Sequence, residues 1–369
     1  MPVPGMVGGG QLARMSHQAA IALGMSLRVL AENPDDAAAR VAHDVDLEAP
    51  DDLAALRAFA KSCDVVTFDH EHVPGDHIRE LERDGVVVYP GADALLHAQD
   101  KLVMRKRLDA LGVPVPAYAP VGDLSDLSRF GDEHGWPLVL KAVRGGYDGR
   151  GVWLLSEPPD ALPDAELYVE ERVSIVHELA VQVARRPNGE MRTWPAVETV
   201  QRDGICHEVI APAPRLNPGF ATEAERIATM LAEELGVVGL LAVELFAAPG
   251  GLVVNELAMR PHNSGHWSIE GAVTSQFEQH LRAVLDWPLG DTSPRAPVTV
   301  MVNLLGGAAT DFSETLPRAL GEVPEASVHL YGKDPRPGRK LGHVTVLGAD
   351  VAETRDRARL AVDLLRGAS

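Results

Sequence analysis

The stretch Val253–Trp267 carries an unusually dense set of side chains that can do chemistry. It begins with apolar residues typical of a buried strand and continues into a carboxylate, a guanidinium, imidazoles, amides and a hydroxyl. These groups belong to Glu256, Arg260, His262, His266, Asn255, Asn263 and Ser264. A core does not need this mixture, and ligands bind where strands run out into loops. The stretch therefore predicts a strand end that delivers side chains to a ligand.

A second carboxylate, Glu244, lies on the preceding predicted strand, Leu240–Phe246. The turn Pro249-Gly250-Gly251 leads to the next predicted strand, Leu252–Leu257, and Glu244 and Glu256 are each six residues from Gly250. A hairpin folded there would place the two carboxylates opposite each other, which destabilises a strand pair unless a cation compensates. Mg²⁺ takes one or two carboxylates plus phosphate oxygens. The alternative is a solvated pair on an edge hairpin, but the apolar flanks indicate burial and favour a metal site.

A glycine-rich loop, RGGYDGRG at positions 144–151, joins two further predicted strands, Leu138–Ala142 and Val152–Leu155. Its four glycines free the backbone to surround an anion with N–H groups. Lys141 and Arg150 supply positive charge for phosphate oxygens. The loop is not a Walker loop, because it lacks GK[ST] and leads into a strand. It predicts a flexible lid over a nucleotide, with a generous hairpin turn as the alternative.

The elements that position these groups fall into two regions. Strand and helix signals alternate in the first hundred residues, which predicts a parallel sheet with helices on its faces. The predicted elements are helices at Gln11–Leu23, Asp51–Lys61 and Asp100–Leu111 and strands at Leu27–Ala31, Val65–Phe68 and Val86–Val88. Beyond Pro114 the predicted strands come in pairs, which indicates antiparallel hairpins. The pairs are Leu138–Ala142 with Val152–Leu155, Leu167–Val169 with Glu178–Val183, and Leu240–Phe246 with Leu252–Leu257.

Helices near Thr222–Leu235 and Thr274–Leu285 complete an α+β centre. Asp291–Pro297 reads as a linker. The tail has strands near Val298–Leu305, Ser327–Tyr331 and Gly342–Leu347, then a helix from Asp350 to Leu365. The predicted fold class is α/β with this α+β centre.

Composition narrows the classes of function. The chain has 369 residues, 46% apolar and 24% charged, as expected for a soluble globular protein of two or three domains. Its formal net charge of −19 argues against a nucleic-acid or anionic-membrane surface. Cys63 and Cys206 form no CxxC pair, which argues against a disulfide framework and fits a reducing cytoplasm. We find no signal peptide and no apolar run of membrane-spanning length.

Together these features resemble the ATP-grasp superfamily and, within it, the N5-carboxyaminoimidazole ribonucleotide synthetases of purine biosynthesis. The segments that carry the resemblance are Gly8–Met15, Thr67–Pro74, Gln99–Leu108, Lys141–Gly151, Asn255–Trp267, Ser275–Ala283 and Tyr331–His343, of which the last three are specific to this branch. The resemblance implies an N-terminal α/β domain over 1–98, an ATP-grasp domain over 99–292 and a small β-rich C-terminal domain over 293–369. It also implies a homodimer.

The resemblance implies an ATP and metal site as well. Lys101 and Lys141 would contact phosphates, and Glu178 the ribose. Glu244 and Glu256 would hold Mg²⁺, with Mn²⁺ as the alternative ion. The implied ATP-binding set is Lys101, Lys141, Gly145, Gly146, Tyr147, Asp148, Gly149, Arg150, Gly151, Glu170, Glu171, Arg172, Val173, Glu178, Asn255 and Glu256. Many ATP-grasp enzymes have a third metal ligand, Asn, where this chain has Ala258, so coordination would rest on two carboxylates and phosphate.

The implied reaction is that of an ATP- and bicarbonate-dependent ligase. Bicarbonate attacks the γ-phosphate to give carboxyphosphate and ADP. Carboxyphosphate, or CO₂ released from it, then carboxylates the amine of 5-aminoimidazole ribonucleotide. Asp148, Tyr147 and Arg260 are the implied catalytic residues, with Asp148 orienting or deprotonating the amine. The implied substrate-binding residues are Glu71, Arg260, His262, Asn263, Ser264, Lys333, Arg339 and Lys340.

Three other functions are open from the sequence. A formate-dependent glycinamide ribonucleotide transformylase shares the lid and the Glu–Arg-Pro-His strand end, but Asn263–Trp267 and Gly338–His343 favour the carboxylating enzyme. An NAD-dependent dehydrogenase would use Gly8-x-Gly10-x-x-Ala13 with Glu32, a weak fingerprint by itself. A non-catalytic nucleotide sensor would bind ATP without turnover, and the intact glutamate pair argues against it.

Two polar clusters are interpreted as ordinary surface. His70, His72 and His77 could be read as zinc ligands, but solvated or hydrogen-bonded histidines are favoured because no cysteine accompanies them. Arg105 and its basic neighbours in Asp100–Leu111 are interpreted mostly as a solvated helix face, on which only Lys101 has a functional role.

Overall fold

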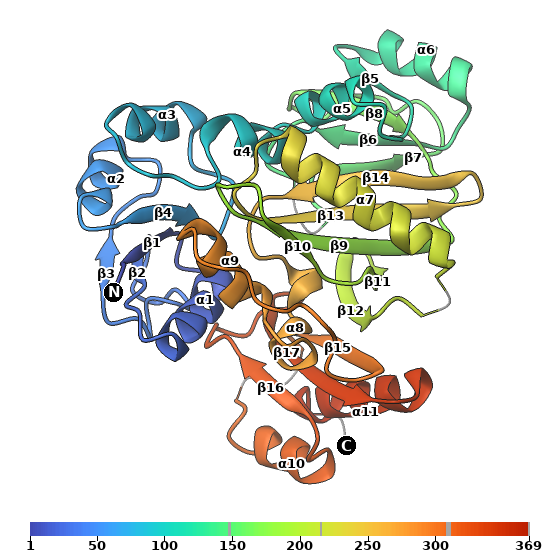
Figure 1. Cartoon of the computed structure of the whole chain (residues 1–369). Coiled ribbons are helices and arrows are strands. Elements are labelled where there is room, and N and C mark those ends of the chain that lie inside the picture. Colours follow the sequence, from blue (N-terminus) through green and yellow to red (C-terminus); the bar gives the residue numbers. More distant parts are fainter. Residues whose placement is uncertain (147–148, 215, 308–310, 368–369) are drawn as a thin grey trace.

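The computed structural model describes residues 1–146, 149–214, 216–307 and 311–367, and its described strands form three sheets (Figure 1). The first sheet is parallel, as predicted, with the order β3-β2-β1-β4. Its strands are β1 (Pro4–Val7), β2 (Arg28–Ala31), β3 (Val45–Leu47) and β4 (Val65–Phe68), and its helices are α1 (Gln11–Ala22), α2 (Leu53–Ala60) and α3 (Gly75–Arg83). The predicted strand Val86–Val88 is wrong. It forms one bridge, Val88 to Val66, and Pro90 then follows without an N–H to continue the ladder.

A small antiparallel sheet has the order β5-β8-β6-β7. It comprises β5 (Tyr118–Val121), β6 (Leu138–Ala142), β7 (Val152–Leu155) and β8 (Leu167–Glu171), and α6 (Leu124–His134) packs on it. The predicted pairing of β6 with β7 is confirmed. The predicted pairing of β8 with the following strand, β9 (His177–Arg185), is wrong, because β9 belongs to the large sheet. Residues 172–176 cross between the sheets: Glu171 bonds to Ala117 and Val176 bonds to Ala247.

The large sheet has the order β14-β13-β9-β11-β12-β15-β17-β16, with β10 paired to β9. The strands not yet given are β10 (Met191–Thr193), β11 (Val197–Arg202), β12 (Ile205–Ala211), β13 (Gly239–Ala248), β14 (Gly251–Ala258), β15 (Val298–Leu305), β16 (Ser327–Leu330) and β17 (Lys340–Gly348). Pairing of β12 with β15 joins the C-terminal strands to the central ones, so one continuous sheet spans both parts of the chain.

Helices bury the faces of this sheet. The helix α7 (Pro218–Glu234) lies across β9 and β13, and its buried residues share the largest apolar cluster with both strands (Figure 1). It begins before the predicted Thr222 because Asn217 caps it and Pro218 suits a first turn. The remaining helices are α4 (Ala92–Gln99), α5 (Lys101–Ala110), α8 (Ser268–Gly271), α9 (Gln276–Val284), α10 (Thr315–Glu322) and α11 (Val351–Leu365). Across the described residues, no helix is long and apolar enough to cross a membrane.

His280 on α9 ties the first sheet to the large sheet. Its Nδ1 accepts the N–H of Leu240 on β13 at 3.2 Å, which assigns the ring proton to Nε2. Nε2 then donates to Thr67 Oγ1 on β4 at 2.8 Å. The ring is fully buried, and this burial lowers the pKa of His280 to about 3.

This geometry predicts that acid weakens the fold through His280. The folded protein keeps the ring neutral, whereas the unfolded chain protonates it below its ordinary pKa of about 6.5. Stability from this group is therefore present above pH 6.5 and lost as pH falls toward 3. Between pH 7 and pH 5 the loss should be ~2 kcal/mol. Urea unfolding of wild type and His280→Gln at both pH values measures it. An unchanged difference between the two proteins would contradict the prediction.

Candidate active site

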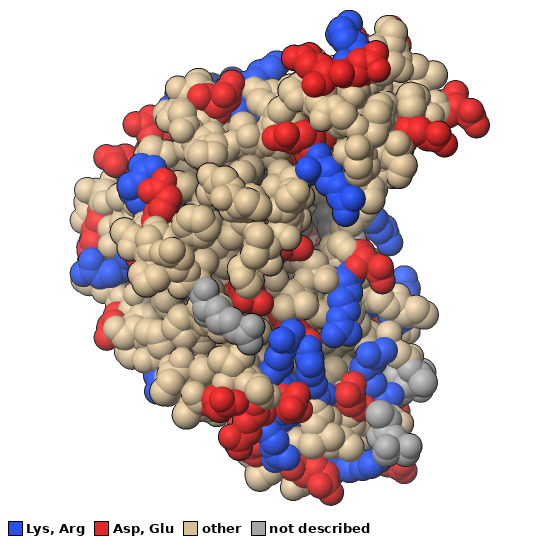
Figure 2. Space-filling view, turned by 90° about the vertical axis from the view of Figure 1, so that its right-hand side faces the viewer, with Lys and Arg blue, Asp and Glu red and all other residues tan. Residues whose placement is uncertain are grey.

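A cavity of about 1300 Å³ opens between the small sheet and the β13–β14 hairpin. Figure 2 shows one face of the molecule hollowed, with Lys and Arg side chains gathered beside and below the hollow. The chain thus concentrates positive charge locally although its net charge is −19. Most residues predicted for the site line this cavity: Glu71, Lys101, Lys141, Gly145, Gly146, Gly149, Arg150, Glu170, Glu171, Arg172, Val173, Glu178, Glu244, Asn255, Glu256, Arg260, His262, Asn263 and Lys340.

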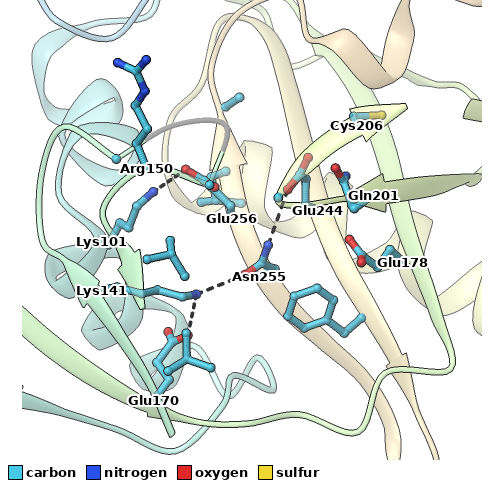
Figure 3. Close-up of a pocket in the computed structure, with 18 of the residues that line it drawn as sticks. Lys101, Lys141, Arg150, Glu170, Glu178, Gln201, Cys206, Glu244, Asn255 and Glu256 are labelled. Atoms are coloured by element: carbon cyan, nitrogen blue, oxygen red, sulfur yellow. Dashed lines mark hydrogen bonds and ion pairs between the residues drawn. The ribbon is translucent and has the colours of Figure 1, made fainter. Parts of the chain in front are cut away.

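A β-bulge in the hairpin aims three of these side chains at one place. Starting at the turn, β13 and β14 pair regularly up to the pair of Leu245 with Val254. The next pair is Glu244 with Glu256. Asn255 is the extra residue of the bulge, since it has no partner on β13. A bulge breaks the strict alternation of faces. Asn255 and Glu256 therefore both line the cavity, beside Glu244 (Figure 3).

The two carboxylates of this cluster differ in charge. Partial desolvation, then the nearby charge of Glu256, raises the pKa of Glu244 to about 7. Desolvation also acts to raise the pKa of Glu256, but the ammonium of Lys101, which contacts its carboxylate, more than offsets this and lowers it. Two carboxylates held together in this way form a pair that a cation would stabilise.

The oxygen donors of this cluster fit a hard divalent cation. Glu244 and Glu256 contribute carboxylates, and the side-chain N–H of Asn255 donates to Glu244 Oε2 at 3.5 Å. No group of three or more His, Cys, Asp or Glu side chains within the described part of the chain is arranged to hold a metal. Two carboxylates completed by phosphate oxygens are the pattern that Mg²⁺ prefers. The residues present therefore fit Mg²⁺ bound together with a nucleotide.

Basic side chains face the carboxylates from the small sheet and α5 (Figure 3). Lys141 Nζ lies 2.6 Å from Glu170 Oε2 and 3.4 Å from Asn255 Oδ1. The start of α5 is tied to the glycine loop, because Lys101 N–H donates to Val143 O at 3.0 Å. The predicted residues Tyr147 and Asp148 lie outside the described residues. Lys101 and Lys141 thus place two cations beside the carboxylate cluster of the hairpin.

A second group of polar side chains lies at the end of β14. Arg260 Nε is 2.8 Å from Glu71 Oε1. The backbone N–H and C=O of His262 are both held by the side-chain amide of Gln276, at 2.9 and 2.8 Å. His262 Nδ1 is 2.8 Å from Ser264 Oγ. Burial, then the charge of Arg260, lowers the pKa of His262 to about 3, so this imidazole is neutral.

Four predicted residues do not line the cavity: Gly151, Ser264, Lys333 and Arg339. Ser264 is buried and contacts His262 and Gln182 instead, so it orients the imidazole. Lys333 contacts the side chain of Gln11, and Arg339 donates to Asp334 O at 3.1 Å. Of the three basic residues predicted to hold a ribonucleotide phosphate, only Lys340 reaches the cavity wall.

Sequence reasoning missed several contributors. The largest is Gln276, whose clamp on His262 is described above. Its only sequence signal is its place in the matching segment Ser275–Ala283. Gln276 does not itself line the cavity. Unpredicted residues that do line it include Gln11, His70, His72, Trp136, Gln201, Cys206, Phe246 and Leu257. The rings of His70 and His72 stack with centroids 5.3 Å apart, and His70 Nδ1 accepts the N–H of His72 at 3.1 Å.

The glycine loop before α1 does not support a dinucleotide site. Asp69 Oδ2 accepts the N–H of Gly10 at 2.6 Å, so a carboxylate of the protein occupies the N-terminus of α1. Gly8 has a φ of +108°, and a Cβ there would lie 1.8 Å from Asp69 Oδ1. A dinucleotide pyrophosphate binds through these same helix-terminal N–H groups. The dehydrogenase alternative therefore lacks its anion site.

Comparisons with known proteins agree with this geometry. Residues 1–99 match the ribonucleotide synthetase preATP-grasp domain, 106–277 the ATP-grasp domain and 299–357 the phosphoribosylaminoimidazole carboxylase C-terminal domain. The chain is 56% identical to the N5-carboxyaminoimidazole ribonucleotide synthase of Mycobacterium tuberculosis over 376 residues, covering 99% of this chain and 88% of the relative.

Solved structures agree as well. The N5-carboxyaminoimidazole ribonucleotide synthetase of Thermotoga maritima is 38% identical, with a TM-score of 0.88 over 99% of this chain and 98% of that one. The synthase of Aspergillus clavatus, in complex with ADP and 5-aminoimidazole ribonucleotide, is 33% identical, with a TM-score of 0.90 over 99% and 98%. The resemblance and the α/β fold expected from the sequence are confirmed. The chain belongs to the N5-carboxyaminoimidazole ribonucleotide synthase family of ATP-grasp enzymes.

Proposed function

We propose that this chain is a ligase of purine biosynthesis that uses ATP and bicarbonate to carboxylate 5-aminoimidazole ribonucleotide. The products are N5-carboxyaminoimidazole ribonucleotide, ADP and phosphate. One observation carries the proposal: the carboxylate pair with its facing lysines opens into the same cavity as Arg260 and His262. A relative that binds both ADP and 5-aminoimidazole ribonucleotide supports it.

On the nucleotide side, the protein positions phosphates and neutralises their charge. Lys101 and Lys141 would contact the phosphate oxygens, and Glu178 the ribose hydroxyls. Glu244 and Glu256 would hold Mg²⁺, which when bound neutralises charge on the transferring phosphoryl group. A bicarbonate oxygen attacks the γ-phosphorus and the bond to the β-phosphate oxygen breaks, giving carboxyphosphate and ADP.

On the acceptor side, Arg260 would stabilise the charge of carboxyphosphate. The amine of the ribonucleotide then attacks the carboxyl carbon, the bond to the phosphate oxygen breaks, and Asp148 takes the amine proton. His262 is neutral at physiological pH, so it would bind and orient rather than donate a proton. Lys340, with Lys333 and Arg339 nearby in sequence, would meet the 5′-phosphate.

Asp148→Asn tests the assignment of the base. We expect carboxylation to fall by ~10²-fold, the usual contribution of a general base, while the Kd for ATP changes less than about threefold. Turnover assays and calorimetry on the same preparation measure the two effects. Equal losses in both would assign Asp148 to the lid over the nucleotide and not to the amine.

A coupled ADP-release assay tests the function itself. Bicarbonate with 5-aminoimidazole ribonucleotide should support turnover, and formate with glycinamide ribonucleotide should not. The reverse result would establish the transformylase alternative. ATP binding without turnover on either pair would establish a sensor.

The proposal extends to ion, assembly and location. The carboxylates of Glu244 and Glu256, which lie opposite each other and line the cavity, support Mg²⁺ dependence, with Mn²⁺ as the alternative ion. Family resemblance supports a homodimer and domains at 1–98, 99–292 and 293–369. The two cysteines, at positions 63 and 206 and in no CxxC pair, support a reducing cytoplasm. Light scattering coupled to size exclusion tests the dimer.

A further inference from the structure

Arg105 is a fully buried cation one helical turn after Lys101. Its side chain has 0% exposure, although the sequence predicts a solvated face for this helix. That prediction is wrong for Arg105. Residues four positions apart lie on the same side of a helix, so Arg105 shares the face of Lys101. The face of α5 that presents Lys101 to Glu256 therefore also presents Arg105 to the protein interior.

The guanidinium of Arg105 holds the backbone of the bulge. Its Nη2 donates to Asn255 O at 2.7 Å and its Nη1 to Val254 O at 3.2 Å. These carbonyls lie on β14, the edge strand of the large sheet. The N–H of Val254 is bound on that same outer edge by Pro114 O at 2.9 Å. Arg105 thus satisfies the two carbonyls that lead into Glu256, which would otherwise be buried acceptors without a partner.

The same guanidinium contacts the carboxylate with which Lys141 pairs. Arg105 Nε donates to Glu170 Oε1, while Lys141 approaches Glu170 Oε2 at 2.6 Å. Glu170 is buried, so its charge must be matched within the protein. With Arg105 present, Glu170 is shared between two cations, so an anionic ligand can pair with the charge of Lys141 that Glu170 does not neutralise. Without Arg105, the Glu170 carboxylate would keep Lys141 as its ion-pair partner among the described residues.

We propose that Arg105 is a positioning residue that fixes the Asn255–Glu256 bulge in its metal-binding orientation and keeps Lys141 available to phosphate. The inference rests on the proposed function for its effect on turnover. Its effect on Mg²⁺-dependent nucleotide binding can be measured without the reaction. Arg105 lies on α5 and contacts two other elements, β8 and β14. It does not itself line the cavity, so it acts through other side chains.

Arg105→Lys is the decisive variant. Lysine keeps a charge beside Glu170 but lacks the planar fork that reaches two carbonyls at once. We expect ADP to bind ~10-fold more weakly in the presence of Mg²⁺, and metal-free ADP within about twofold of wild type. Turnover should fall by ~10²-fold, as for a displaced catalytic geometry. Calorimetry with ADP, with and without Mg²⁺, measures the first effect. Arg105→Met should show a larger loss, and if it does not fold, Arg105→Lys decides alone.

Arg107→Lys is the matched control. Arg107 is on the same helix, its side chain is 39% exposed, and it pairs with Glu234 at 3.1 Å. It should match wild type in both binding and turnover. If Arg105→Lys lowers Tm but leaves the ratio of ADP affinities with and without Mg²⁺ unchanged, the residue is merely structural and the proposal is wrong. If wild type does not carboxylate the ribonucleotide, yet the ratio still changes in Arg105→Lys, the proposed function fails while the role of Arg105 stands.

Discussion

Glu256→Gln is expected to lower ADP formation by ~10³-fold. Removal of one preorganised electrostatic contact lowers kcat by about this factor in other enzymes. The amide keeps the size of the side chain but removes a full negative charge from the pair with Glu244. It also leaves Lys101 without its carboxylate partner. A cation held by one carboxylate instead of two would bind the nucleotide phosphates less tightly. Turnover at saturating ATP, as a function of Mg²⁺ concentration, measures the loss.

The control for this variant is Glu223→Gln on α7. Glu223 pairs with Arg226 at 2.7 Å in a solvent-exposed ion pair, and neither residue lines the cavity. Exposed pairs contribute little, so Glu223→Gln should behave as wild type. If the Glu256→Gln variant retains wild-type turnover and Mg²⁺ dependence, the carboxylate hairpin is not the metal site.

The sequence predicts the pairing of Glu244 with Glu256 correctly, but equal spacing from the turn is not the full reason for it. Counting six residues from Gly250 assumes a turn centred on that residue. The structure turns on Pro249 and Gly250, a register that by itself would set Glu244 against Asn255. The bulge at Asn255 moves the register by one residue and restores the pair. A bulge depends on what covers the strand edge, here Arg105, and that contact is distant in sequence.

Local patterns predicted the elements better than their partners. The strands β4 and β15 were predicted with the bounds they have, because apolar runs show directly in the sequence. The pairing of β8 with β9 failed, because hairpin logic assumes that neighbouring strands pair, and only residues 172–176 decide that the chain changes sheets. The glycine loop at Gly8 was ambiguous for the same reason. Asp69, which fills it, comes from another strand end.

Charge was the hardest property to place. Arg105 and Arg107 are two residues apart and alike in type, yet one is buried against Glu170 and the other pairs at the surface with Glu234. Helical spacing from Lys101 would have distinguished the buried arginine from the exposed one, because Arg105 lies on the same helix face as Lys101 and Arg107 does not. That argument needs one residue of the face to be placed first, which family resemblance did for Lys101.

Arg260→Met is expected to lower carboxylation by ~10³-fold, in the range found when an arginine that stabilises transferred phosphoryl charge is lost. Burial acts to lower the pKa of Arg260, but the charges of Glu71 and Asp69 outweigh it and raise the pKa, so the guanidinium is always charged. Methionine fills similar volume without charge and leaves Glu71 unpaired. Because Arg260 pairs with Glu71 and not with the carboxylates that Lys101 and Lys141 contact, the Kd for ATP should change less than about threefold.

A double variant separates the two consequences of this loss. Glu71→Gln combined with Arg260→Met removes the unpaired carboxylate, so any disorder caused by that charge should be relieved. Catalysis should nevertheless stay near the level of Arg260→Met alone, because the cation that faces carboxyphosphate is still absent. Arg226→Met on α7 is the matched control and should leave turnover unchanged, since Arg226 lies in an exposed pair. Recovery of turnover in the double variant would show that Arg260 only neutralises Glu71 and has no contact with the reacting groups.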